Sequence, residues 1–135
     1  MHIFVPIDDR EGLLFNRRRQ SRDRALMEEM LLRCGPSPLR ISPFSQDLFT
    51  PEEADRIAVS EDFLDTAQAG DFCLCEDRAL APYEDRIESL TLCRWNRDYP
   101  GDFFLDLDLA AWRLQETKEI PGTSHDTITL EVYVK

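Results

Sequence analysis

Histidine and long apolar runs are scarce in this chain, and both absences narrow its chemistry. The 135 residues include two histidines, His2 and His125, which stand 123 positions apart and lack the spacing of metal ligands. We therefore predict no metal site. No apolar run approaches the length of a membrane span, and the first residues lack the basic and then apolar pattern of a signal peptide. We therefore expect a cytoplasmic protein.

The chain also has few positively charged residues relative to its acidic ones. The chain holds 16 Lys and Arg against 27 Asp and Glu, for a formal net charge of −11. General nucleic-acid binding needs a basic face that displaces counterions, so we expect no such partner, and no membrane partner either. Hydrophobic residues make up 42% and charged residues 32%, as in ordinary globular proteins. The length predicts a single domain over residues 1–135.

The four cysteines all lie in apolar segments. In a cytoplasmic protein such residues are reduced and behave as small buried hydrophobes. Cys73 and Cys75 would point to the same face of a strand, which is compatible with a metal pair, but no histidine lies near them in sequence. We therefore predict buried thiols at all four positions, Cys34, Cys73, Cys75 and Cys93.

Residues 12–30 reverse the charge of the rest of the chain, and we expect a loop there that turns into a helix. Five of the residues from 16 to 24 are arginines against one acid, which makes a local charge of about +4. Either the arginines pair with the protein's own acids, or they form an anion-binding loop at a helix N-terminus. The arginines are Arg17, Arg18, Arg19, Arg22 and Arg24, and the candidate ligand contacts among them are Arg17, Arg18, Arg19 and Arg22.

Apolar runs alternate with helical segments along most of the chain. This alternation predicts parallel strand pairing and an α/β class, with a mostly parallel mixed sheet in a three-layer α-β-α sandwich. The final strand follows another strand with no room for a crossover helix, so we expect it to be antiparallel. Strands are expected over 2–7, 39–42, 57–59, 71–76, 89–95 and 127–134; short apolar segments over 103–107 and 110–114; helices over 21–33 with Ser21 as N-cap, 61–69 with Ser60 as N-cap, and 79–87; and a capping box at Thr50 and Glu53.

Two further residues are candidates for ligand binding. Asp8 follows the first strand, where open α/β sheets place their ligand crevices, although a solvated turn is the alternative. Phe15 offers a stacking face to a heterocycle, although a Phe beside Leu13 and Leu14 also suits a core.

The order of the elements resembles the dihydrofolate reductase fold family. That family begins with a strand, a Gly-containing loop and a helix with a catalytic carboxylate in its first turn, which here are HIFVPI, Gly12 and Asp23. The segments IAVSEDFLDTAQAGDFCLCED and ALAPYEDRIESLTLCRWNRDYPGDFFLDL resemble the middle of the family. Trp112, the Thr123-Ser124-His125 tripeptide and TITLEVYV are similar to its end. The resemblance implies this fold and makes Asp23 the candidate catalytic acid.

The chain departs from the family where the cofactor binds. The paired glycine beside the cofactor pyrophosphate is replaced by Glu76-Asp77, and the Gly-Arg step after the second strand by Ser42-Pro43-Phe44. The connection over 43–55 is too short for the strand that supports the adenosine half. Cys93 replaces the threonine that supports the catalytic acid. We therefore expect the usual NADPH site to be missing and predict no cofactor.

The chain also resembles short bacterial proteins that carry a ribonuclease Z assignment. That enzyme needs a cluster of histidines and aspartates for two metal ions, and two distant histidines do not supply one. The sequence gives ribonuclease Z activity no support.

Three functions remain open on the sequence. The first is a binding module of this fold that recognises a small anion, a nucleotide or a protein partner through the loop from Arg17 to Arg24. The second is a divergent NADPH-dependent pterin or heterocycle reductase with Asp23 as the acid, and the third is an interaction subunit without a ligand. The pKa of Asp23 discriminates between the first two, because a catalytic acid needs a raised pKa and neighbouring arginines would lower it.

Overall fold

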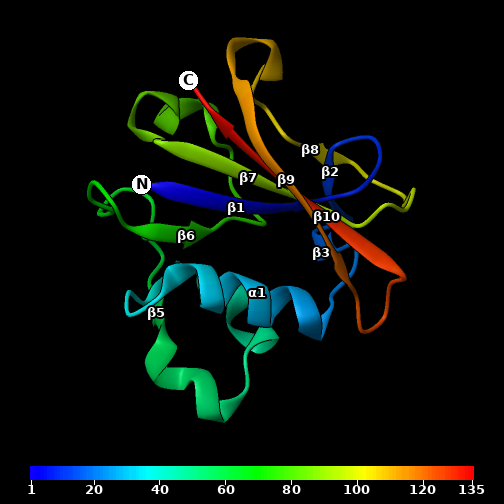
Figure 1. The fold of residues 1–135 in the computed structure, drawn as a ribbon. Helices are drawn as coiled ribbons and strands as arrows, with labels where there is room; N and C mark the ends of the chain where they lie inside the picture. The colour runs from blue at the N-terminus through cyan, green and yellow to red at the C-terminus, as the bar shows by residue number, and fades with distance from the viewer.

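A seven-stranded mixed sheet forms the centre of the computed structural model, which describes all 135 residues (Figure 1). The strand order is β5-β4-β6-β1-β7-β10-β9. The first five strands in that order pair in parallel, and β10 is antiparallel to both of its neighbours, as predicted for the last strand. The strands are β1 (His2–Ile7), β4 (Leu39–Ile41), β5 (Ile57–Val59), β6 (Phe72–Leu74), β7 (Ser89–Arg94), β9 (Arg113–Pro121) and β10 (Thr127–Val134).

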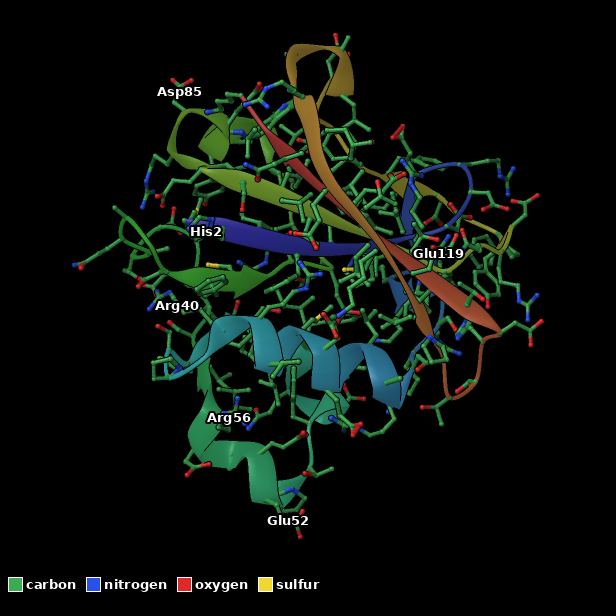
Figure 2. The ribbon with its side chains drawn as sticks, viewed as in Figure 1. His2, Arg40, Glu52, Arg56, Asp85 and Glu119 are labelled. Carbon is green, nitrogen blue, oxygen red and sulfur yellow. The ribbon has the colours of Figure 1, made fainter.

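The two faces of this sheet are covered differently. The single α-helix, α1 (Arg24–Cys34), lies along one face and packs its buried side chains on β1, β6, β7 and β10 (Figure 1). The side chains in Figure 2 fill the space between α1 and the sheet. The other face packs against residues 61–67, the segment after β6, and a small sheet near residues 12–19. Alternate residues of β1 therefore enter different clusters: Ile3 and Val5 face this side, and Phe4 faces α1.

The small sheet has the strand order β3-β2-β8, where β2 is Gly12–Phe15, β3 is Arg18–Arg19 and β8 is Phe103–Phe104. A tight turn at Asn16 and Arg17 joins β2 to β3, and both residues have positive φ values, 52° and 62°. Two consecutive positive φ values are typical of the type I′ turns that close two-residue hairpins. The expected loop before the helix is therefore largely a β-hairpin.

Three expected helices are corrected by the structure. Helix α1 begins at Arg24 rather than after Ser21, because the side chain of Asp23 accepts the Ala25 N–H (2.9 Å) and caps it. Residues 61–69 form turns, and residues 79–87 contain a 3₁₀ helix, η3 (Ala81–Arg86). Pro82 lacks an N–H, and the Asp106 carboxylate takes the N–H groups that begin this segment.

Three other short helices are 3₁₀ turns. The capping box at Thr50 and Glu53 is present and begins η2, as predicted. Arg56, at the end of η2 and labelled in Figure 2, donates to the Leu31 carbonyl oxygen near the end of α1 (2.9 Å). The three are η1 (Pro43–Leu48), η2 (Pro51–Arg56) and η4 (Leu109–Ala111).

Besides the hairpin strands β2 and β3, the sequence prediction also missed most of β9. The segment expected over 110–114 is η4 followed by β9, which continues to Pro121. Ile120 is the only buried residue of β9, and its other side chains are exposed. An edge strand with an almost entirely polar surface has no apolar alternation to reveal it.

The cysteine prediction is confirmed: all four thiols are free and buried. Burial raises the pKa of Cys73 to about 11 and the pKa of Cys34, Cys75 and Cys93 to about 12. None of the chain's helices has both the length and the apolar composition to cross a membrane.

Candidate functional site

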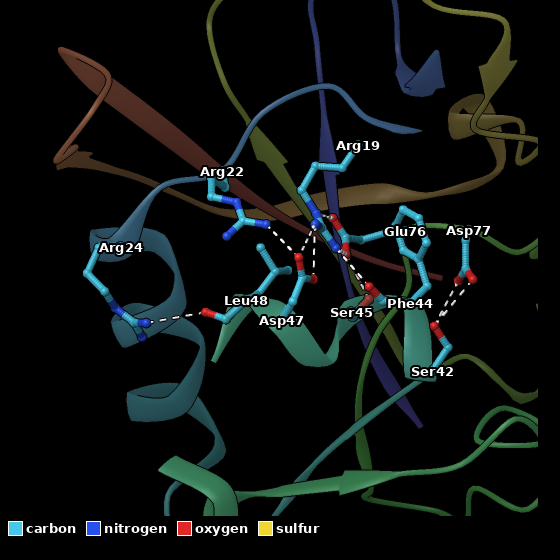
Figure 3. Close-up of polar contacts among 10 residues, drawn as sticks. All are labelled: Arg19, Arg22, Arg24, Ser42, Phe44, Ser45, Asp47, Leu48, Glu76 and Asp77. Carbon is cyan, nitrogen blue, oxygen red and sulfur yellow. Dashed lines mark hydrogen bonds and ion pairs between the residues drawn. The ribbon is translucent and has the colours of Figure 1, made fainter. Parts of the chain in front are cut away.

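Arg19 makes the best-enclosed ion pair of the arginine-rich segment (Figure 3). Its Nε donates to Glu76 Oε2 and its second guanidinium nitrogen to Glu76 Oε1, both at 2.9 Å. The side chains of Arg19 and Glu76 are 12% and 6% exposed. Ser45 Oγ also donates to Glu76 (2.7 Å), and the guanidinium lies 4.8 Å from the centre of the Phe44 ring. Arg19 is thus held by the protein's own carboxylate.

Two more arginines are paired internally. Arg22 donates to Asp47 Oδ2 (2.8 Å), and Arg24 donates to both oxygens of Glu53 (3.0 and 2.8 Å) (Figure 3 draws the first). The Arg22–Asp47 pair is more than half exposed, so it is a weak contact. The interpretation in which arginines pair with the protein's own acids therefore describes Arg19, Arg22 and Arg24.

Arg17 and Arg18 differ from the other three arginines. Both are exposed at the tip of the β2–β3 hairpin, and neither forms a hydrogen bond or ion pair through its side chain. Phe15, in the same hairpin, is 49% exposed and so is not a core residue. The hairpin tip therefore presents two free guanidinium groups and an open aromatic ring.

The surface is hollowed on both sides of this tip. One depression, of about 290 Å³, holds Arg18 beside Tyr99. The other, of about 310 Å³, holds Arg17 opposite Asp77 and Asp102. The first is lined by Phe15, Asn16, Arg18, Arg19, Gln20, Tyr99 and Pro100, and we call it the Arg18 depression. Of the two depressions, only the one beside Arg17 is lined by carboxylates.

Asp23, the candidate catalytic acid, is 2% exposed and fully hydrogen-bonded. Its Oδ1 accepts the N–H groups of Ala25 and Thr123, both at 2.9 Å. Its Oδ2 accepts the N–H groups of Ser124 (2.7 Å) and His125 (3.1 Å), and lies 3.0 Å from His125 Nδ1. The sequence analysis matched both Asp23 and the 123–125 tripeptide to positions of the same fold family. In the structure the two are in direct contact.

These donors set the charge state of Asp23. Burial alone would raise the pKa of this carboxyl, but the Thr123 N–H, the His125 ring and the N–H groups of Ser124 and Ala25 together lower it to about 2. A lowered pKa agrees with the expectation for an Asp23 that is not the catalytic acid. The groups that lower it are backbone N–H groups and the His125 imidazole, whereas the sequence pointed to the neighbouring arginines. A carboxylate with this pKa has no proton to donate near neutral pH.

The second ring nitrogen of His125 continues the chain of contacts. Its Nε2 lies 3.0 Å from Ser21 Oγ and 3.1 Å from the Tyr99 hydroxyl, which itself lies 3.4 Å from Ser21 Oγ. The indole of Trp95 stacks on the imidazole with ring centres 4.8 Å apart. The sequence prediction missed this cluster, and its only signal was a single histidine in the tripeptide after Gly122.

The other two candidate ligand residues are turned inward. Asp8 is 0% exposed; its carboxylate accepts the N–H groups of Arg10 (3.0 Å), Gly12 (2.7 Å) and Tyr99 (3.1 Å), and the Gln20 amide (3.3 Å). These bonds join the loops after β1 and β7. The Cys93 thiol donates weakly to the Thr91 carbonyl oxygen (3.7 Å), and no hydrogen bond joins it to Asp23.

The residues at the family's cofactor positions do not fit a dinucleotide phosphate. Glu76 is committed to Arg19, and Asp77 accepts the Ser42 hydroxyl (3.1 Å). Two carboxylates stand where the family has bare backbone, and carboxylates repel phosphate. No group of three or more His, Cys, Asp or Glu side chains is placed to hold a metal ion.

Comparison with solved structures identifies the architecture. The chain is similar to dihydrofolate reductase from Enterococcus faecalis, solved with NADP(H) and RAB-propyl, with a TM-score of 0.68 and 10% sequence identity. The match covers 98% of this chain and 94% of the reductase. No protein-family model matches the chain, and no curated protein matches it either. The chain therefore has a dihydrofolate reductase-like α/β fold.

Proposed function

We propose that this chain is a binding module of dihydrofolate reductase-like fold that recognises a small anionic ligand, such as a nucleotide, in the Arg18 depression. The observation that carries the proposal is that Arg18 has no internal partner, whereas Arg19, Arg22 and Arg24 each have one. In a chain of net charge −11, a guanidinium left free of acids is available to an external anion.

The rest of the Arg18 depression suits an aromatic ligand. Phe15 and Tyr99 supply ring faces on which a base can stack, and Arg18 supplies two parallel donors for a phosphate or carboxylate. Asn16 and Gln20 add amide groups at the edge. Aromatic faces that stack on bases and arginines that neutralise phosphates are combined in proteins that bind single-stranded nucleic acids, and the same chemistry suits a nucleotide.

The Arg17 side supports anion binding less. Asp77 and Asp102 line that depression, and Asp102 accepts the Asn16 N–H (3.0 Å), so its carboxylate stays beside the turn. Two carboxylates offset the charge of one arginine. The proposal therefore assigns recognition to Arg18 and predicts a smaller part for Arg17.

The reductase alternative has less support from the same residues. It needs an acid that carries a proton, and the pKa of Asp23 is lowered to about 2. It also needs a cofactor phosphate site, and the residues at that position are Glu76 and Asp77. The interaction-subunit alternative draws on two exposed aromatics of the small sheet, Phe15 and Phe104, which are 49% and 45% exposed.

The test is a titration with AMP, ADP, ATP, pyrophosphate and NADPH at low salt, followed by calorimetry and thermal unfolding. A ligand that binds the native state raises the melting temperature. We expect a nucleotide to do so, with Arg18→Ala weakening its binding roughly tenfold or more and Arg17→Ala weakening it less than about threefold.

The matched pair of variants separates the outcomes. Equal losses in both variants would mean that the hairpin acts only through its overall charge. NADPH binding that is unaffected by Arg18→Ala would favour the reductase alternative. If no ligand shifts the transition, the small-ligand proposal fails and the exposed aromatic pair becomes the surface to pursue.

A further inference from the structure

Ser21, His125 and Asp23 form a chain of hydrogen-bonding contacts, with His125 in the middle. This chain lies next to the Arg18 depression but outside it. The Ser21 Oγ to His125 Nε2 distance is 3.0 Å, and the His125 Nδ1 to Asp23 Oδ2 distance is also 3.0 Å. We propose that these three residues form an acyl-transfer site in which Ser21 is the nucleophile, His125 the general base, and Asp23 the residue that positions the imidazole.

Asp23 meets the requirements for the positioning residue. It is buried, and four backbone N–H groups hold its two oxygens in place. Because an ionised carboxylate only accepts hydrogen bonds, His125 must donate to it through Nδ1. That fixes the tautomer whose Nε2 has a free lone pair, which is the form that removes a proton from a serine.

His125 is fixed more firmly than a surface histidine. It is 5% exposed, and the Trp95 indole stacks on it at an interplanar angle of 22°. Its ring therefore has one orientation, set by Asp23 on one nitrogen and by stacking on its face. A base held in this way loses little entropy when it acts.

Ser21 is the group that solvent can reach. It is only partly buried, in the segment that joins β3 to α1. Two hydroxyls face His125 Nε2: Ser21 Oγ lies at 3.0 Å and the Tyr99 hydroxyl at 3.1 Å. The Tyr99 hydroxyl also lies 3.4 Å from Ser21 Oγ, to which it can donate. When Tyr99 donates to Ser21 Oγ, the Ser21 proton points at Nε2, and this is the arrangement that the reaction uses.

Donors for a developing oxyanion are present beside the nucleophile. The backbone N–H groups of Ser21 and Arg22 form no hydrogen bond within the chain. The N–H of a nucleophilic serine is a usual member of an oxyanion hole. The Arg22 guanidinium, on the next residue, is 55% exposed and is paired with Asp47, so the backbone donors carry this role.

The reaction needs only water and an ester. The Ser21 hydroxyl proton moves to His125 Nε2 as the Oγ–carbon bond forms; the ester C–O bond then breaks, and the leaving alcohol takes that proton. Water repeats the sequence at the acyl-serine, with His125 accepting and returning one proton, and releases the carboxylic acid. The substrate class is a small activated ester.

This activity goes beyond ligand binding at Arg18 and does not depend on it. A small neutral probe requires no guanidinium, so a failure at Arg18 leaves the acyl-transfer site testable. Equally, a nucleotide can bind the Arg18 depression whether or not Ser21 reacts.

The chain also contains a matched control. Ser89 Oγ lies 2.7 Å from His2 Nδ1, but the carboxylate beyond that ring, on Glu88, is 4.0 Å from Nε2 and 43% exposed. Ser89 thus has a histidine without a buried positioning carboxylate. If Ser–His proximity alone sufficed, both serines would react.

The experiment treats the full chain with a fluorophosphonate and with para-nitrophenyl acetate, and maps adducts by mass spectrometry. We expect one adduct, at Ser21, that Ser21→Ala abolishes and Ser89→Ala leaves unchanged. His125→Gln should slow labelling roughly 100-fold or more, the size of a general-base contribution. Circular dichroism establishes that each variant is folded.

A comparison of native and urea-unfolded wild-type chain needs no variant. The proposal predicts that Ser21 reacts at least about tenfold faster in the native chain, because only folding assembles the base beside it. Equal rates in the two states, labelling of Ser89 as fast as Ser21, or labelling unaffected by His125→Gln in a folded variant would each overturn it.

Discussion

Asp23 illustrates how position changes the chemistry of one residue. In the reductase fold the first-turn carboxylate is expected to face a substrate, but here its oxygens are taken by α1, by the turn over residues 122–125 and by His125. Its pKa falls to about 2 from an ordinary value of 3.8. The hydrogen bonds that keep Asp23 ionised prevent it from donating a proton, and they also tie the start of α1 to the turn over residues 122–125.

This carboxylate predicts a pH dependence of stability. Because the folded pKa lies below the unfolded one, Asp23 adds stability above about pH 5, and this is lost as the pH falls through about 4 to about 2. The amount is about 2 kcal/mol. We expect Asp23→Asn to lower the free energy of urea unfolding at pH 7 and to lie much closer to wild type at pH 2. A difference that is constant with pH would contradict the low pKa.

Arg17 has a backbone conformation that its residue type does not favour. Its φ of 62° lies in the left-handed region, where a Cβ atom is strained. Arg17→Gly should therefore stabilise the hairpin by about 0.5–1 kcal/mol in thermal or urea unfolding. Asn16→Gly is the control, because Asn tolerates its φ of 52° and should gain less. If Arg17→Gly destabilises the chain, the Arg17 side chain makes a contact that its exposure does not suggest.

At the scale of elements, the Arg19–Glu76 pair joins three segments that are distant in sequence. Arg19 comes from β3, Glu76 follows β6, and Ser45 lies in η1 (Figure 3). The pair is enclosed, so each charge depends on the other to offset its desolvation. Glu76 stands where the sequence resemblance places the family's paired glycine, so an internal ion pair is found at this position.

We expect Glu76→Gln alone to destabilise the chain by about 3 kcal/mol, since it leaves the enclosed Arg19 guanidinium with only the exposed Asp47 carboxylate, at 3.2 Å. Adding Arg19→Met should recover part of this loss, with a coupling energy of about 1–3 kcal/mol in a double-mutant cycle. Arg22→Ala, which breaks the exposed pair with Asp47, should cost less than about 1 kcal/mol. Additive losses for Arg19 and Glu76 would show that the enclosed pair is not coupled.

The elements that the sequence predicted well are those with apolar periodicity. β1, β7 and β10 bury nearly every or every second residue, and the antiparallel direction of β10 followed from the short connection before it. The segments 61–69 and 79–87 resembled helices, but the first forms turns and the second a 3₁₀ helix. The Asp71 and Asp106 carboxylates accept backbone N–H groups in these two segments. Such long-range or turn contacts leave no periodic signal.

At the scale of the whole molecule, the turn over residues 122–125 closes the end of the chain onto the start of α1. Gly122 is required there, because a Cβ atom would lie 2.4 Å from the His125 carbonyl oxygen and 2.9 Å from Asp23 Oδ2. We expect Gly122→Ala to lower the free energy of unfolding by about 2–3 kcal/mol, measured as a lower urea midpoint with an unchanged m value.

Gly35→Ala is the control for that variant. Gly35 also has a restrictive conformation, with φ of 58°, but a Cβ atom would meet nothing within 4 Å. Its cost should therefore be backbone strain alone, about 1–2 kcal/mol, because φ of 58° with ψ of −128° is a conformation that side chains rarely adopt. Equal effects at the two glycines would show that the contact with Asp23 and His125 adds nothing.

The candidate site could be predicted only in part. Sequence proximity grouped the five arginines, but which of them find acids depends on Asp47, Glu53 and Glu76, which the fold brings from elsewhere. Asp23 and His125 are about 100 residues apart in sequence, and only the resemblance to the fold family named both of them. Local patterns predict elements, while the pairing of side chains depends on tertiary structure.

The two edges of the large sheet have a consequence for how copies of this chain meet. β5 has three residues, and β9 is long but carries exposed Arg113, Glu116, Lys118 and Glu119. Short strands and charged strands are poor templates for another chain's backbone. Even in a crowded cell, neither edge strand therefore offers a good template for extending the sheet into a second molecule, and the fold resists growth into a fibre.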